Sequence, residues 1–352
     1  MSKKHFSVLL LVTVVVAVLV LLVPGKTANE SVFQKQGLLP GLATLVNDIK
    51  YVRLSGAGGE TIATLNRLDG KWQVAESSDY PADWTVLRQL LSDLAVAQVI
   101  EQKTSNPEFY ARLGVEDVDG PDASGVLIEF AEATGLPSLI VGNKAQGRVG
   151  QYVRLSGNDQ SALIDRVLTV PGEMQQWLDR EIIDIQQAEV VEMSVTHPDG
   201  EQILLHKASA DDTDFALQEI PEDQEIKSNW TVNSIGGSMA ALRLDTVVPD
   251  SEIDWANAVK INLLTADGVQ VSAQLVSVED QYWISLSASV YQGAGSGEPA
   301  DAGMEADAFG ELTERVSRIT DRVTGWAFAI PQYKAEAMTK RMDDLLKPLE
   351  TD

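Results

Sequence analysis

Residues 259–275, VKINLLTADGVQVSAQL, alternate apolar and polar side chains on both sides of an Asp-Gly pair. Successive side chains of a β-strand point to opposite faces, so Val259, Ile261 and Leu263 would share one buried face. The Asp-Gly pair is typical of a tight hairpin turn. The stretch therefore predicts two antiparallel strands, and residues 282–286 predict a third strand beside them.

The rest of the second half extends this sheet and adds helices. Residues 191–205 alternate around the turn at Asp199-Gly200, which predicts another hairpin. Residues 325–330 form a short apolar segment typical of a strand or a packing segment. Apolar side chains at steps of three and four residues predict helices over about residues 228–244, 312–323 and 335–346.

The first half shows the same order of patterns. Residues 49–74 contain three alternating runs with intervening turns, which predicts a three-stranded meander. A helix that packs on the sheet is predicted from Trp84, with Leu87, Leu91 and Leu94 on the same face. The remaining predicted elements are a short helix over residues 106–114, strands over residues 126–130, 138–141 and 151–155, and a helix or turn segment over residues 172–183.

These patterns predict an α+β fold made of two related modules of antiparallel sheet with packed helices. We place the first module at residues 46–187 and the second at residues 188–352. Their parallel order indicates an internal duplication, although residue identity between the halves is low. Residues 292–310 are small, acidic and without periodicity, so we expect a flexible insertion there.

An unbroken apolar run stands at residues 6–23, behind Lys3 and Lys4. A run of this length comes close to crossing a hydrocarbon core about 30 Å thick. We therefore predict an uncleaved N-terminal signal anchor, a transmembrane helix, within residues 1–26 and a tether over residues 27–45. The basic residues before the run place the N-terminus in the cytoplasm and the body outside it. The alternative is a cleaved signal peptide, for which residues 23–25 make a poor cleavage site.

The composition describes an acidic, cysteine-free body. The chain has 352 residues, 44% of them hydrophobic, which is enough for about two domains with cores of their own. Its formal net charge of −25 repels phosphate backbones, so we expect no nucleic acid as a partner. The absence of cysteine excludes disulfides, thiolate metal sites and cysteine nucleophiles.

The sequence contains no recognisable catalytic signature. Neither a Gly-x-Ser-x-Gly elbow nor a phosphate-binding Gly-x-x-x-x-Gly-Lys-Ser/Thr loop is present. His197 and His206 flank the predicted hairpin and could face each other as a two-nitrogen metal site, but solvated hairpin residues are the simpler interpretation. The acidic segments 116–122 and 211–214 are better explained as a polar turn and a charged hairpin tip than as calcium ligands. We therefore assign no catalytic, cofactor-binding or metal-binding residue and expect no cofactor.

Seven tryptophans could line a groove for a glycan or a peptide. Most of them stand in apolar patterned segments, which favours core packing for each one. They are Trp72, Trp84, Trp177, Trp230, Trp255, Trp283 and Trp326.

Several short segments, together with the apolar N-terminus, resemble the domain-of-unknown-function family 4340. They are residues 68–74 (LDGKWQV), 80–83 (YPAD), 106–114 (NPEFYARLG), 177–180 (WLDR), 330–334 (IPQYK) and 343–346 (DDLL). The resemblance implies a bacterial, membrane-associated protein of mixed α and β structure with no assigned activity. Some family members resemble companions of ABC transporters related to gliding-motility systems.

We therefore expect an accessory protein rather than an enzyme. It would be a single-pass protein of the bacterial inner membrane, with its body in the periplasm and a protein partner in an ABC-type transporter or envelope complex. Two alternatives stay open. One is a ligand-binding subunit that serves a transporter, and the other is a hydrolase that uses paired carboxylates on envelope polymers.

Overall fold

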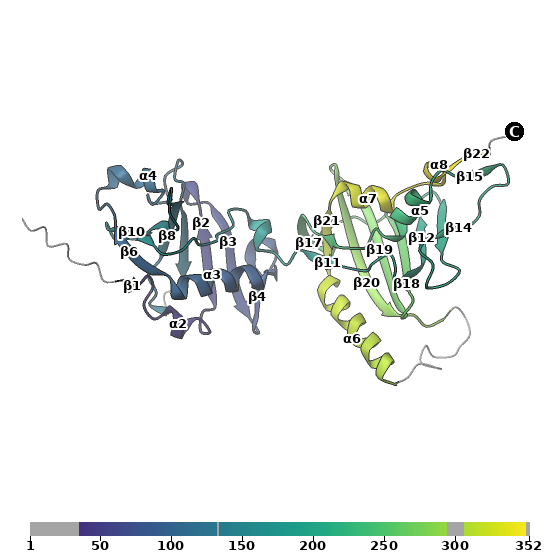
Figure 1. Cartoon of the computed structure of the whole chain (residues 1–352). Helices are drawn as coiled ribbons and strands as arrows, with labels where there is room; N and C mark the ends of the chain where they lie inside the picture. Colours follow the sequence, from purple (N-terminus) through teal and green to yellow (C-terminus); the bar gives the residue numbers. More distant parts are fainter. Residues whose placement is uncertain (1–34, 132–133, 294–305, 350–352) are drawn as a thin grey trace, which may run out of the picture.

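The computed structural model describes residues 35–131, 134–293 and 306–349 and folds them around two large antiparallel sheets (Figure 1). We call the ten-stranded sheet with its helices the first module, and the eight-stranded sheet with its helices the second module. The protein is therefore rich in sheet with several packed helices, and the predicted α+β class is confirmed.

The first sheet has the strand order β1-β6-β10-β9-β8-β7-β2-β3-β4-β5. Its strands are β1 (Gln36–Gly37), β2 (Tyr51–Ser55), β3 (Thr61–Leu68), β4 (Lys71–Val74), β5 (Tyr80–Pro81), β6 (Gln98–Gln102), β7 (Val126–Phe130), β8 (Leu139–Lys144), β9 (Gln151–Leu155) and β10 (Ser161–Ile164). The predicted meander is confirmed as β2, β3 and β4. The strands β6 and β10 were not predicted, because neither shows a regular alternation of apolar and polar side chains.

The second sheet has the order β14-β13-β12-β18-β19-β20-β21-β17, and the pairs β11-β16 and β15-β22 lie outside it. The strands of this half are β11 (Glu181–Ile183), β12 (Val190–Thr196), β13 (Gln202–His206), β14 (Ala216–Leu217), β15 (Gln224–Ile226), β16 (Leu242–Arg243), β17 (Thr246–Pro249), β18 (Val259–Thr265), β19 (Val269–Val278), β20 (Gln281–Val290), β21 (Trp326–Ile330) and β22 (Leu346–Pro348). The hairpin predicted from residues 259–275 is β18 with β19, and Ile261 and Val271 are buried in it as predicted.

The two sheets share one connection pattern. Eight strands of the first sheet follow the order β4-β3-β2-β7-β8-β9-β10-β6, and the second sheet places β14-β13-β12-β18-β19-β20-β21-β17 in the corresponding positions. When only these eight strands of each sheet are numbered in chain order, both orders read 3-2-1-5-6-7-8-4. The first sheet adds β5 beside β4 and β1 beside β6.

Helices pack against both sheets. They are α2 (Leu42–Leu45), α3 (Trp84–Val96), α4 (Tyr110–Leu113), α5 (Asn229–Gly236), α6 (Ala306–Val323), α7 (Gln332–Met338) and α8 (Met342–Leu345), with 3₁₀ turns η1 (Ala57–Gly59), η2 (Ala75–Ser77), η3 (Pro107–Phe109), η5 (Met174–Trp177) and η6 (Asp250–Glu252). The helices α3 and α5 hold equivalent places in chain order, since each follows the third strand of its module.

The helix α3 begins where the sequence predicts it. Asp83 caps it, and its side chain accepts hydrogen bonds from the backbone of Thr85 and Val86. The buried stripe consists of Leu87, Leu90, Leu91 and Leu94. Trp84 does not belong to this stripe, because its side chain is 49% exposed at the first helical position.

Two predicted helices are shorter in the structure. The helix predicted over residues 228–244 is α5, which ends at Gly236, and the chain then turns so that β16 pairs with β11. Consecutive glycines at 236 and 237 favour this early end. The helix predicted over residues 335–346 is divided into α7 and α8, and Leu346 belongs to β22.

The predicted flexible insertion at residues 292–310 overlaps a helix. Residues 294–305 lie outside the described residues, but α6 already begins at Ala306. The apolar stripe predicted for this helix faces the sheet, with Leu312 and Val323 buried.

The predicted tether also overlaps the folded body. Leu38, Leu39 and Leu42 are buried in the core of the first module, and β1 pairs with the edge strand β6. Folded structure therefore begins before residue 46. The apolar run at residues 6–23 lies outside the described residues, and no helix within the described part of the chain is long and apolar enough to cross a membrane.

The two modules contact each other through aromatic side chains. The ring of Tyr80 in the first module meets the ring of Trp326 in the second, with centroids 5.1 Å apart and planes at 88°. The chain that leads to the second module is held beside this contact, because the backbone nitrogen of Asp83 donates a hydrogen bond of 2.7 Å to the carbonyl of Trp177, which is fully buried. We call this contact the module seam.

Candidate functional site

The helices α5 and α7 of the second module form the walls of an open groove of about 680 Å³. Val232 and Ile235 anchor α5 in the core, and Ala335 and Met338 anchor α7. Figure 1 shows the two helices near each other at one end of the second sheet. Because the buried sides of the helices hold them in the core, their outer sides can present a fixed surface.

The loop before α5 fixes the position of this helix. The backbone nitrogen of Phe215 donates to Oδ1 of Asn233, and Nδ2 of Asn233 donates to Oδ1 of Asp214 at 2.6 Å. A side chain at Gly236 would meet the ring of Phe215 at 2.2 Å, so glycine permits this close packing. Part of the predicted charged hairpin tip at residues 211–214 thus holds α5.

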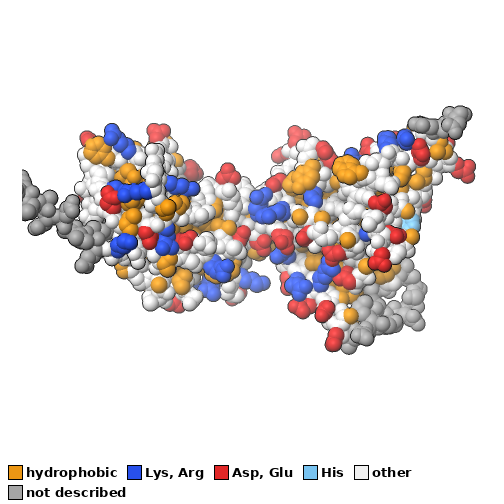
Figure 2. Space-filling view, viewed as in Figure 1, with side chains coloured by type: hydrophobic (Ala, Val, Ile, Leu, Met, Phe, Trp, Pro, Cys, Tyr) orange, Lys and Arg blue, Asp and Glu red, His pale blue; other side chains and the backbone are white. Residues whose placement is uncertain are grey.

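Two large aromatic side chains stand exposed on the rim of the groove. Trp230 on α5 is 78% exposed, and Tyr333 on α7 is 67% exposed. Figure 2 shows hydrophobic side chains at the surface over α7. Exposed aromatic side chains of this size are typical of interaction surfaces, because they bury a large area at a small entropic cost when a partner covers them.

A lysine supports the floor of the groove. Nζ of Lys334 donates hydrogen bonds to the carbonyls of Ser238 and Ala240, at 3.3 and 2.5 Å. Burial lowers the pKa of Lys334, although the charge of Asp184 acts in the opposite direction. Because two carbonyls in the turn after α5 hold the ammonium group, Lys334 connects α7 to this turn rather than serving as a free nucleophile.

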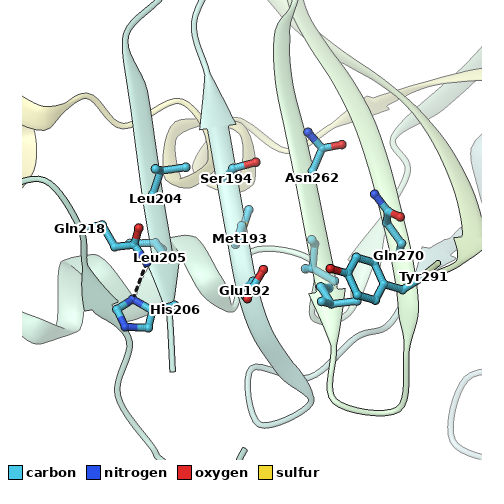
Figure 3. A pocket seen from close by; sticks show the side chains of 12 residues that line it. Glu192, Met193, Ser194, Leu204, Leu205, His206, Gln218, Asn262, Gln270 and Tyr291 are labelled. Carbon is cyan, nitrogen blue, oxygen red and sulfur yellow. Dashed lines mark hydrogen bonds between the residues drawn. The ribbon is translucent and has the colours of Figure 1, made fainter. Parts of the chain in front are cut away.

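A second hollow lies on the opposite face of the second sheet, away from these helices (Figure 3). Glu192 and Ser194 of β12, Asn262 of β18 and Gln270 of β19 point into it, and Tyr291 closes one side. A neighbouring hollow shares Asn262 and continues across β19 and β20. We call this surface the outer face of the second sheet.

The two histidines of the predicted hairpin do not meet. His206 is paired with Glu192 in the register of β12 and β13, whereas His197 lies beyond the end of β12. Nε2 of His197 is 3.0 Å from the carbonyl oxygen of Lys340, and Nδ1 of His206 is 3.1 Å from the side-chain nitrogen of Gln218. The two-nitrogen metal site considered for this hairpin is therefore wrong.

The other candidate residues have structural contacts. Asp117 of the acidic segment 116–122 pairs with Arg154, whose side chain is only 4% exposed. Within residues 35–131, 134–293 and 306–349, no three His, Asp or Glu side chains come together as a metal site would require. Trp72 and Trp177 belong to the core, as predicted, but Trp84 and Trp230 do not.

The groove could not be predicted from the sequence, because its two exposed aromatic residues do not belong to any periodic apolar pattern. Trp230 stands at the start of an amphipathic helix but outside its buried face, and Tyr333 follows Pro331 in a short segment. The two residues are far apart in the chain. Only the packing of α5 beside α7 brings them to one surface.

The comparisons with known proteins identify a family. A family model described as "Domain of unknown function (DUF4340)" matches residues 72–260, more than half of the chain and parts of both modules. The resemblance seen in the sequence is thereby confirmed. No curated protein and no solved structure matches the chain.

Proposed function

The chain belongs to the DUF4340 family, and we propose that it is a membrane-anchored extracytoplasmic interaction protein that docks a protein partner in the α5–α7 groove. The observation that carries this proposal is the pair of exposed aromatics, Trp230 and Tyr333, on two helices that the core holds in place. The partner would be a component of an ABC-type transporter or of another envelope complex.

The groove has the chemistry of a protein-docking surface. Aromatic side chains at the centre of an interface commonly contribute most of the binding free energy. Around them lie Lys340, Glu336 and Asp344, which can form the polar rim of such an interface. The partner surface should therefore offer an apolar anchor surrounded by polar groups of both charges.

The membrane part of the proposal rests on the sequence. The apolar run at residues 6–23 follows two lysines, which supports an anchor with its N-terminus in the cytoplasm. An anchored body with a docking groove suits an accessory subunit, since the anchor confines it to the membrane in which its partner lies.

Crosslinking in native membranes, followed by purification and mass spectrometry, tests this proposal. We expect the unmodified protein to recover a stoichiometric partner, and Trp230→Ala with Tyr333→Ala to reduce that recovery at least tenfold. Trp84→Ala is the matched control, because it also removes an exposed tryptophan but from the first module. Unchanged recovery with the groove variant, or an equal loss with Trp84→Ala, would contradict docking in the groove.

A further inference from the structure

The first module covers the outer face of its own sheet. Residues 103–125, between β6 and β7, fold back over this face, and Tyr110 and Val115 pack there on Ile140 of β8. The approach is close, because a side chain at Gly142 would meet the carbonyl oxygen of Leu113 at 2.4 Å. We call residues 103–125 the cover segment.

The equivalent connection of the second module does not provide such a cover. Residues 250–258, between β17 and β18, contain the turn η6, which contacts β21 beside the edge strand β17, and Asp250 of this turn lines one side of the hollow that continues across β19 and β20. The outward side chains of the central strands stay open to solvent, with Lys260, Asn262 and Ser287 all exposed. Within the described residues, equivalent strands thus carry a covered outer face in the first module and an uncovered one in the second.

The uncovered face has an unusual composition for this acidic chain. Ser194, Asn262, Ser272 and Ser287 stand opposite one another on four successive strands and form one row across the sheet. Oγ of Ser272 donates a hydrogen bond of 2.8 Å to Oδ1 of Asn262. Hydroxyl and amide groups can both donate and accept hydrogen bonds, and neighbouring strands repeat them at intervals of about 4.8 Å.

Charged groups are sparse along this row. Glu192 lies on one side of it, and Lys260 lies on the other side, where Asp250 lines the same hollow. For a chain with a net charge of −25, the two hollows of this face thus contain few charged side chains. Apolar anchors are also few, since the first hollow offers Leu204 and Leu264 beside its polar groups. A protein partner would find little apolar area here, and a nucleic acid would find no basic surface.

We propose that the outer face of the second sheet binds an uncharged oligosaccharide. Sugar hydroxyl groups both donate and accept hydrogen bonds, so they can pair with the hydroxyl and amide groups in the row from Ser194 to Ser287. The apolar side chains of Leu204 and Leu264 would contact the C–H faces of the sugar rings. This site is independent of the α5–α7 groove, because it lies on the opposite side of the sheet.

Calorimetric titration of the full chain tests the site. The probe is a hexamer of β-1,4-linked N-acetylglucosamine, with a glucose hexamer as a second probe, in a detergent whose headgroup is not a sugar. We expect saturable binding of at least one hexamer, and binding at least tenfold weaker with Asn262→Ala and Ser272→Ala combined. Both side chains lie on the solvent side of their strands, so the variant should keep its fold, which circular dichroism verifies.

Two control variants distinguish oligosaccharide binding on the outer face from partner binding in the α5–α7 groove. Asn66→Ala changes an asparagine on β3 of the first sheet, and Trp230→Ala changes the groove, and neither should alter the titration. The proposal is overturned if neither hexamer binds, if the Asn262 and Ser272 variant binds as well as the unmodified chain, or if that variant instead loses a crosslinked protein partner.

Discussion

Arg315 connects a helix to two strands through a pair of carboxylates. Its guanidinium on α6 donates to Asp267 in the turn between β18 and β19 and to Glu189 before β12, both at 2.6 Å. Burial opposes ionisation of Asp267, but hydrogen bonds from Thr265 and Arg315 outweigh it and hold the pKa of Asp267 below its usual value. The ionised carboxylate therefore stabilises the position of α6.

Asp267→Asn should lower the free energy of unfolding at pH 7 by less than about 1 kcal/mol, since the side chain is 45% exposed and solvent weakens the ion pair. A lowered pKa means that this stabilisation is complete above the ordinary carboxyl pKa of about 3.9 and is lost as the pH falls through the lower folded value. Urea unfolding at pH 7 and at pH 3 measures both effects. The difference from the unmodified protein should shrink at pH 3. Glu252→Gln in η6 is the control, and a difference that grows in acid would contradict the assignment.

At the scale of elements, the sequence predicted strands both from alternation and from short apolar runs, including the run at residues 138–141 that forms β8, but it did not predict what packs on them. Residues 259–275 alternate cleanly, because β18 and β19 have a buried face and a solvent face. By contrast, Leu139, Ile140 and Val141 of β8 are all buried, because the cover segment lies on the second face. Periodicity alone therefore could not reveal the cover segment or the groove, which depend on contacts between distant segments.

Gly142→Ala tests how tightly the cover segment lies on the first sheet. The added methyl group would meet carbonyl oxygens of Leu113 and Gly114 at 2.4 and 2.6 Å, so α4 must shift away. We expect a loss of about 1–3 kcal/mol in the free energy of unfolding, together with faster amide exchange in α4. Gly172→Ala is the control, because a methyl group there meets no heavy atom within 4 Å. Equal stability of the two variants would show that the contact is not close in solution.

At the scale of the whole molecule, the sequence predicted two modules with the same order of patterns but not how their strands are arranged. The shared order 3-2-1-5-6-7-8-4 depends on which edges pair, and edge pairing leaves little trace in hydrophobic periodicity. The common topology supports the internal duplication, which stays a prediction about descent. The module seam was also beyond prediction, because Tyr80 and Trp326 are far apart in the chain.

Trp326→Ala should weaken the module seam. Its ring meets Tyr80 edge to face and is only partly buried, so we expect a loss of roughly 2 kcal/mol. Burial also raises the pKa of Tyr80, which indicates that the hydroxyl group loses contact with water at this seam. In scanning calorimetry the variant should separate the unfolding of the two modules into two transitions. Trp84→Ala should leave the profile unchanged. A single sharp transition in the Trp326 variant would mean that other contacts, such as that of Tyr80 with Phe328, suffice to couple the modules.

The strand β1 gives the protein a defined mechanical response. It lies at the end of the first module away from the second (Figure 1) and pairs with β6 through Gln36 and Gly37, and the backbone nitrogen of Leu38 adds a hydrogen bond to the carbonyl of Ala97. Tension on the chain before Gln36 would reach this pair first and separate it before any longer strand is loaded. Each released residue would lengthen the connection by up to about 3.5 Å, until the buried side chains of Leu38 and Leu39 resist. Under such tension the separation of β1 from β6 would thus lengthen the chain by a short distance, while the rest of the first module stays folded.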